Sequence, residues 1–163
     1  MVMGDGAMTA AGPRGAPTEI EAVYRDRYVA LVRHARLIVG SQAVAEELVQ
    51  EAFIRLHRAW DRADEPRAYV HVIVINLCRT WCVRAERERS LTEAIEEPVA
   101  LPPEYDDTWR AMMRLPEKYR TALVLKFYED LAEAEIARLM ECRPGTVKSL
   151  IHRGLGKLRE ELS

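Results

Sequence analysis

The sequence predicts an all-α protein made of two small helical domains that are joined by an extended linker. Apolar residues recur at helical spacing on both sides of a proline-containing segment, and that segment has no periodicity of its own. The chain has 163 residues, 48% of them apolar, which is enough for two small packed cores. The expected organisation is a disordered tail at 1–17, a first domain at 18–90, an acidic linker at 91–103 and a second domain at 104–163.

Two consecutive helices are expected to open the first domain. Thr18 and Glu21 form a capping-box pattern ahead of a helical apolar stripe. Gly40 is expected to end that helix and Ser41 to cap the next. The stripe of the second helix consists of Val44, Leu48, Ala52 and Leu56, widened by Val49, Phe53 and Trp60.

The third segment is ambiguous, because residues 69–77 (YVHVIVINL) are β-branched and alternate at period two, as a strand would. A lone strand among helices would have no partner, so we expect a helix, with Pro66 in its first turn. Over the longer window the helical stripe is Val70, Ile73, Leu77 and Trp81.

Four helices are expected in the second domain. Asp106, Asp107 or Thr108 caps the first, and Pro116 opens the second, whose inward residues are Tyr119, Leu123 and Phe127. The last two helices are expected at Glu133–Met140 and Pro144–Leu162, and the tight turn between them is typical of a helix-turn-helix. The predicted buried stripe of the last helix is Val147, Ile151, Leu155, Leu158 and Leu162.

The charge of the last helix differs from that of the whole chain, whose net charge is −2. Between Arg143 and Arg159 every charged residue is basic, which is typical of a surface that binds a polyanion. A helix of this kind fits the major groove of DNA, although a plain solvated amphipathic helix is the alternative. The residues expected to face DNA are Arg143, Gly145, Thr146, Lys148, Ser149, His152, Arg153 and Lys157.

Several classes of protein are not supported by the sequence. The three cysteines and four histidines show no metal-ligand spacing, so no metal site, cofactor or disulfide framework is expected. No catalytic set is visible, and an enzyme is not expected. Without a signal-peptide pattern or an apolar run of about 20 residues, we expect a cytoplasmic protein with no membrane insertion.

Two blocks of sequence resemble one known family. GTVKSLIHRGLGKLR, preceded by LPEKYRTALVLKFYEDLAEAEIA, is similar to the C-terminal −35-reading domain of extracytoplasmic-function (group 4) sigma factors of the sigma-70 family. AEELVQEAFIRLHRAW and PRAYVHVIVINLCRTW resemble the same family's N-terminal domain. The segments AYVHVIVIN and FYEDLAEAEIA further resemble an actinobacterial subgroup of these sigma factors.

The resemblance implies roles for residues of the first domain. Those that match the segment docking on core RNA polymerase are Glu47, Leu48, Gln50 and Glu51, with Phe53 beside them as a core residue. Those that match the part binding the −10 element are Asp61, Arg62, Arg67, Asn76, Arg79 and Arg84. Asn76 could equally be a hydrogen-bonded core residue.

The predicted function is therefore that of a sigma factor, which directs core RNA polymerase to promoter DNA and assists melting at the −10 element. The resemblance also implies an anti-sigma factor as a partner. The alternative is a stand-alone helix-turn-helix repressor or activator. Leu150 and Thr80 depart from the pattern of many relatives, and Gly154 and Gly156 each weaken the last helix by about 1 kcal/mol relative to Ala.

Overall fold

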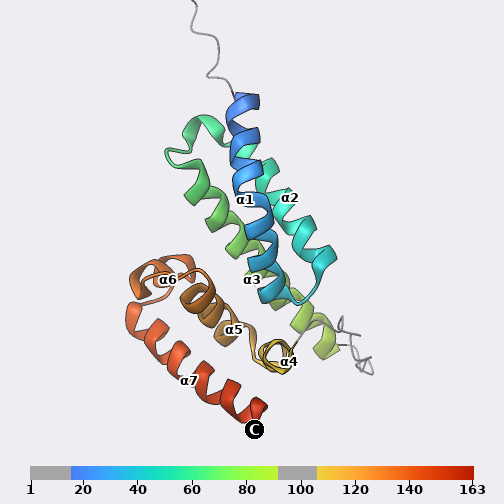
Figure 1. The fold of residues 1–163 in the computed structure, drawn as a ribbon, viewed down its shortest axis with the longest axis vertical. Coiled ribbons are helices and arrows are strands. Elements are labelled where there is room, and N and C mark those ends of the chain that lie inside the picture. The colour runs from blue at the N-terminus through green and yellow to red at the C-terminus, as the bar shows by residue number, and fades with distance from the viewer. Residues whose placement is uncertain (1–15, 92–105) are drawn as a thin grey trace, which may run out of the picture.

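The computed structural model describes residues 16–91 and 106–163, and within these ranges every regular element is a helix (Figure 1). The expected tail and linker fall almost wholly outside these ranges. The expected all-α class is confirmed. We refer to residues 16–91 as the N-terminal lobe and to residues 106–163 as the C-terminal lobe.

The N-terminal lobe consists of three long helices, α1 (Ala16–Val39), α2 (Gln42–Arg58) and α3 (Pro66–Leu91), with a 3₁₀ turn η1 (Trp60–Arg62) between the last two. Gly40 ends α1 with a φ of 82°, which favours glycine, and the Ser41 hydroxyl accepts a hydrogen bond from the Val44 amide at 3.3 Å. Both predicted helix boundaries are thus confirmed. Thr18 does not cap α1, however, because the helix already begins two residues earlier.

The expected helix at 66–91 is confirmed, but its buried face is rotated from the expected one. The fully buried residues of α3 are Val70, Val74, Ile75, Cys78 and Cys82. Ile73, Leu77 and Trp81 are only partly buried. The reason is that α3 packs on α1 and α2 and also contacts the C-terminal lobe, so a wider and shifted face is covered.

The C-terminal lobe contains α4 (Asp107–Arg114), α5 (Glu117–Leu123), α6 (Glu133–Leu139) and α7 (Pro144–Leu162). The Asp106 carboxylate caps α4 by accepting a hydrogen bond from the Trp109 amide at 3.0 Å. A short π-helix, η2 (Val124–Tyr128), continues directly from α5. Its wider turn changes the register of the following residues, so Phe127, which was expected to face inward, is 58% exposed.

The stripe predicted for α7 is correct only in part. Val147 is buried and Ile151 and Leu158 are partly buried, but Leu155 and Leu162 are exposed. Gly154 is buried in their place, because α7 approaches α5 so closely there that an added Cβ would lie 3.3 Å from Leu123 and Tyr119 atoms. This close approach of α7 to α5 explains why a glycine stands at position 154, although glycine weakens a helix.

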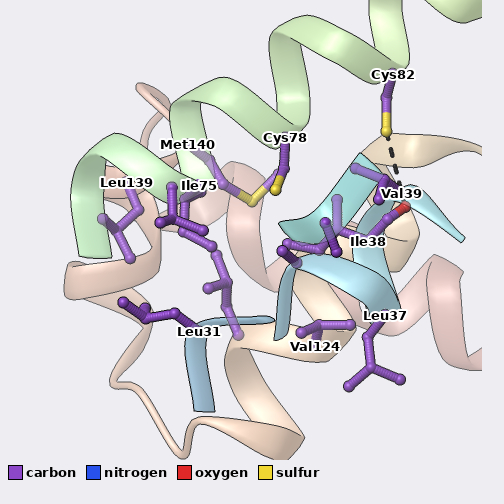
Figure 2. Close-up of a cluster of buried hydrophobic side chains, with 14 of the residues drawn as sticks. Leu31, Leu37, Ile38, Val39, Ile75, Cys78, Cys82, Val124, Leu139 and Met140 are labelled. Atoms are coloured by element: carbon purple, nitrogen blue, oxygen red, sulfur yellow. Dashed lines mark hydrogen bonds between the residues drawn. The ribbon is translucent and has the colours of Figure 1, made fainter. Parts of the chain in front are cut away.

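The two lobes pack against each other through one continuous apolar cluster, which the sequence did not predict. Figure 2 shows residues of α1, α3 and the C-terminal lobe side by side in this cluster. Its labelled members are Leu31, Leu37, Ile38, Val39, Ile75, Cys78, Cys82, Val124, Leu139 and Met140. In Figure 1 the C-terminal lobe lies against the lower halves of α1 and α3, and α2 lies on the other side of the bundle.

Candidate nucleic-acid interface

Helices α6 and α7 form the expected helix-turn-helix. After α6 the chain turns at Glu141, whose φ of 53° is left-handed. The Cys142 amide donates to the Ala137 carbonyl at 2.9 Å, and the Glu141 amide donates to the Arg138 carbonyl at 3.3 Å. This is the Schellman pattern, which satisfies the last carbonyls of a helix while reversing the chain. Pro144 then occupies the first turn of α7.

All the residues predicted to face DNA are exposed on α7 or its N-cap. They are Arg143, Gly145, Thr146, Lys148, Ser149, His152, Arg153 and Lys157. An added Cβ at Gly145 would meet nothing within 4 Å, so the start of the helix is open to a bound group. Ser149 donates its hydroxyl to the Gly145 carbonyl at 3.2 Å, and the Lys157 ammonium lies 5.9 Å from the centre of the Tyr119 ring.

The residues predicted to contact the −10 element lie on η1 and along α3. Those that are exposed are Asp61, Arg62, Arg67, Asn76 and Arg84. Arg67 donates to the Asp26 carboxylate at 2.8 Å. Since Asn76 is exposed, the alternative of a core asparagine is wrong.

Arg79 is placed differently from the other candidates on α3. It is half-buried, with Nε 3.2 Å from a Glu117 carboxylate oxygen and Nη1 2.9 Å from the Met140 carbonyl oxygen. Both partners belong to the C-terminal lobe. Arg79 also lines an open cavity of about 340 Å³ together with residues of α7, namely Thr146, Ser149, Leu150 and Arg153. The structure thus brings a predicted −10 residue next to predicted −35 residues.

The residues predicted to dock on polymerase lie on α2. Glu47 and Gln50 are exposed, Leu48 is partly buried, and Glu51 pairs with Arg55 at 2.7 Å. Phe53 is buried, as expected. Next to these residues, α1 and α2 form a mostly apolar groove of about 440 Å³, lined by Ile20, Glu21, Tyr24, Gln50, Phe53, Ile54, His57 and Arg58. Tyr24 and Ile54, which are half-exposed, were not predicted to belong to a binding surface. The exposure of a large apolar residue becomes visible only in the structure.

A cluster of titratable residues, which was not predicted, also lies between the lobes. His34 of α1 and His71 of α3 both face the Glu129 carboxylate, which follows η2. The three residues are far apart in the chain, so no ligand spacing could have revealed them. Burial alone would raise the pKa of Glu129. The two imidazoles outweigh this effect and lower the pKa to about 2.

The three cysteines are free thiols. Burial raises the pKa of Cys78, and it raises the pKa of Cys82 although the Arg120 guanidinium opposes this effect. Both side chains belong to the apolar cluster between the lobes, and Cys142 is only partly buried. The burial of Cys78 and Cys82 is typical of free cysteines, which pack as small apolar residues.

Comparison with known families gives the fold and the interface a common explanation. Residues 23–88 match sigma-70 region 2, and residues 105–158 match sigma-70 region 4. The chain belongs to the sigma-70 family. It is an RNA polymerase sigma factor of the extracytoplasmic-function group, and it directs the polymerase to promoters. The two regions in family order do not favour a stand-alone regulator.

Individual sigma factors are similar to this one over nearly their whole length. The RNA polymerase sigma-E factor of Streptomyces coelicolor is 34% identical over 160 residues, which cover 91% of this chain and 88% of that one. The sigma-E factor of Streptomyces avermitilis is 32% identical over 156 residues, covering 91% and 87%. The SigW factor of Bacillus subtilis is 29% identical over 173 residues, covering 93% and 91%.

Solved structures show the same fold. The sigma factor RpoE from Bartonella quintana, in complex with the anti-sigma factor NepR, superposes with a TM-score of 0.67. It is 22% identical, and the match covers 90% of this chain and 95% of that one. CnrH, in complex with the cytosolic domain of CnrY, gives a TM-score of 0.64 at 20% identity, covering 91% and 90%. Across residues 16–91 and 106–163, no helix has the length and apolar character needed to span a membrane.

Proposed function

We propose that this sigma factor reads the −35 element with the outer face of α7, and that its N-terminal lobe binds core polymerase and the −10 element. The observation that carries the proposal is the outer face of α7 itself. Between Arg143 and Arg159 it exposes cations and hydroxyls without a carboxylate, directly after a helix-turn-helix turn. Hydroxyls and guanidinium groups can reach base edges, and lysines can contact phosphates.

The docking of core polymerase is assigned to the exposed face of α2 and the groove beside it. The groove offers the apolar surface of Tyr24 and Ile54, and the exposed Glu47 and Gln50 lie on the same helix. An apolar groove with carboxylate and amide groups at its edge suits a basic amphipathic helical partner. Since α2 takes little part in the contact between the lobes, this surface stays open in the arrangement observed.

The arrangement observed must open before a promoter can be bound at both elements. The −10 and −35 elements are separated by roughly 25 base pairs, or about 85 Å of B-form DNA at about 3.4 Å per step. In the structure Arg79 of α3 and Arg153 of α7 line one cavity of about 340 Å³. A single duplex cannot place both elements there, so the lobes have to separate.

We place this activity in the cytoplasm, where polymerase and promoters meet, and assign the chain no catalysis of its own. Melting at the −10 element is assigned to η1 and α3, whose exposed Arg62 and Arg84 can contact single-stranded backbone. We also propose that an anti-sigma factor binds this chain, since the sigma factor RpoE, which shares its fold, is known in complex with the anti-sigma factor NepR.

Run-off transcription with core polymerase tests the proposal. We expect the full chain to direct specific initiation from its promoter and to bind the same DNA weakly without polymerase. Arg153→Gln should lower promoter-specific initiation roughly tenfold or more, because a base-contacting arginine contributes about 1–3 kcal/mol. Lys148→Gln should weaken binding and reduce the salt dependence by about one unit of slope.

Arg110→Gln is the matched control, because this exposed arginine lies on α4 and is absent from the proposed DNA surface. It should transcribe as the parent does. Tight binding of the free chain to a palindromic duplex, with no stimulation of core polymerase, would contradict the proposal and support a stand-alone regulator.

A further inference from the structure

The cluster of His34, His71 and Glu129 joins the two lobes at a point that the proposed function does not use. His34 and His71 belong to α1 and α3 of the N-terminal lobe, and Glu129 directly follows η2 in the C-terminal lobe. All three side chains are largely buried, with exposed fractions of 15%, 13% and 4%. The π-helix before Glu129 is a feature that often accompanies functional sites in other proteins.

The ligand atoms of this cluster converge on one small volume. His34 Nδ1 lies 2.9 Å from Glu129 Oε1, and His71 Nε2 contacts the other carboxylate oxygen. One atom from each residue can be chosen so that all three lie within 4.8 Å of one another. A tetrahedral ion with bonds of about 2.0–2.1 Å holds its ligand atoms roughly 3.3 Å apart. The contacts of the carboxylate with the two imidazoles are shorter than this value, so an ion needs the three side chains to move slightly apart.

The same atoms lack aligned hydrogen bonds. His34 Nδ1, His71 Nε2 and Glu129 Oε1 are buried, and none has a hydrogen-bond partner of acceptable geometry among the described residues. Buried polar atoms are nearly always well hydrogen-bonded, whereas these atoms have only one another as ion-pair partners, so a cation is a candidate partner for them. A cation placed between them would satisfy all three.

The chemistry of the ligand set fits one class of ion. Two imidazole nitrogens and one carboxylate oxygen are the ligands that Zn²⁺ and neighbouring first-row divalent ions take, whereas Ca²⁺ and Mg²⁺ prefer oxygen. Three protein ligands leave a fourth position for water.

We propose that His34, His71 and Glu129 bind a divalent transition-metal ion of the Zn²⁺ class, and that the bound ion holds the two lobes together. Separation of the lobes removes Glu129 from the two histidines, so only the closed arrangement offers all three ligands. A ligand shifts a two-state equilibrium by the ratio of its affinities for the two states. The ion therefore favours the closed state, and promoter binding disfavours the ion.

Metal binding can be tested independently of the proposed function. The expected effect of the metal on transcription rests on the proposed function. The test uses the untagged full chain and Co²⁺, which replaces Zn²⁺ and gives visible d–d absorption in a tetrahedral site. We expect one Co²⁺ per chain and displacement of the bands by Zn²⁺. No thiolate-to-cobalt charge-transfer band should appear, because no cysteine is a ligand.

His34→Gln, His71→Gln and Glu129→Gln should each weaken the apparent affinity for Co²⁺ by roughly tenfold or more. His57→Gln is the matched control for metal binding, because this histidine is exposed on α2, away from the cluster. Circular dichroism verifies that each variant is folded. Two separate histidine variants keep the test decisive if the Glu129 variant does not fold.

The absence of d–d bands in the folded parent chain would overturn the proposal, as would binding that none of the three variants weakens. In either case the cluster is an ion pair between the lobes. Hydrogen exchange tests whether the ion holds the lobes together: Zn²⁺ should slow amide exchange at the contact between the lobes in the parent and leave exchange in His71→Gln unchanged. A chain that binds Co²⁺ but shows no slower exchange at the contact between the lobes with Zn²⁺ would refute the second half of the proposal.

Transcription without added metal separates this inference from the proposed function. If initiation occurs and no metal binds, only the metal site fails. If metal binds and core polymerase is not stimulated, only the proposed function fails. If both hold, Zn²⁺ should inhibit initiation by the parent and leave the His71→Gln chain uninhibited.

Discussion

The guanidinium group of Arg120 on α5 donates a hydrogen bond from Nε to the carbonyl oxygen of Ile38, near the end of α1, at 2.6 Å. The same buried group donates to the carbonyls of Met113 and Leu115 at 3.1 and 3.0 Å. One side chain therefore satisfies carbonyls from both lobes. Its fourth acceptor is the Cys82 sulfur of the N-terminal lobe at 3.9 Å, so two of the four acceptors lie in its own lobe and Arg120 keeps half of its partners when the lobes separate.

Replacement of Arg120 should destabilise the chain strongly. In Arg120→Met three carbonyl oxygens lose their charged donor, and we expect the free energy of unfolding to fall by roughly 2–4 kcal/mol. Urea denaturation followed by circular dichroism measures this. Arg110→Met is the control, because its pair with Asp107 is solvent-exposed, and it should change the stability by less than about 0.5 kcal/mol. Equal losses in the two variants would contradict this role for Arg120.

The two glycines of α7 should respond oppositely to alanine. Gly156 has open space where a Cβ would be placed, so Gly156→Ala should stabilise the chain by about 0.5–1 kcal/mol through helix propensity. A Cβ at Gly154 would lie 3.3 Å from Tyr119 Cβ, which is fixed to the α5 backbone. Gly154→Ala should therefore lose that gain and destabilise by about 1 kcal/mol or more. Thermal unfolding of both variants measures the two changes in stability. Equal stabilisation by both alanines would show that α7 does not pack this closely on α5.

The helix-turn-helix turn carries a glutamate in a left-handed conformation. Because an L-residue there costs roughly 1–2 kcal/mol, Glu141→Gly should stabilise the chain by about 1 kcal/mol. Glu141→Ala removes the same charge but keeps the unfavourable φ, so it should show no such gain. A gain of the same size in the alanine variant would assign the effect to charge instead of backbone.

Much of this fold could be predicted because its signals are local. Ser41, Pro66, Asp106 and Pro144 mark helix starts through their own hydrogen bonds or ring geometry, and the structure confirms each of these boundaries. The sequence also predicted correctly that α3 is a helix and not a strand, despite its β-branched residues.

The remaining features depend on packing between distant parts of the chain. The π-helix that exposes Phe127, the rotation of the buried face of α3 and the burial of Gly154 all arise from neighbours that no sequence window contains. The same holds for the contact of Arg79 with Glu117. Most of the residues predicted to bind DNA and polymerase lie on exposed surfaces, whereas Leu48, Glu51 and Arg79 are partly buried, and the roles of all of them stay predictions.

The three thiols should differ in reactivity. Burial raises the pKa of Cys78 and Cys82, so at pH 8 they hold less reactive thiolate than a free cysteine and are also shielded from reagents. Titration with a disulfide reagent should detect about one fast thiol, Cys142, in the native chain and all three in urea. Rapid reaction of all three without denaturant would contradict the packing between the lobes.

The central claim is that the chain is closed when free and opens on a promoter. The most direct measurement is the distance between spin labels at Val29→Cys and Glu160→Cys, both exposed positions, in a Cys142→Ser background. We predict a single narrow distance distribution in the free chain and an increase of several tens of ångströms in the complex with core polymerase and promoter DNA, given the separation of about 85 Å between the two elements. An unchanged distance in an active promoter complex would contradict the account.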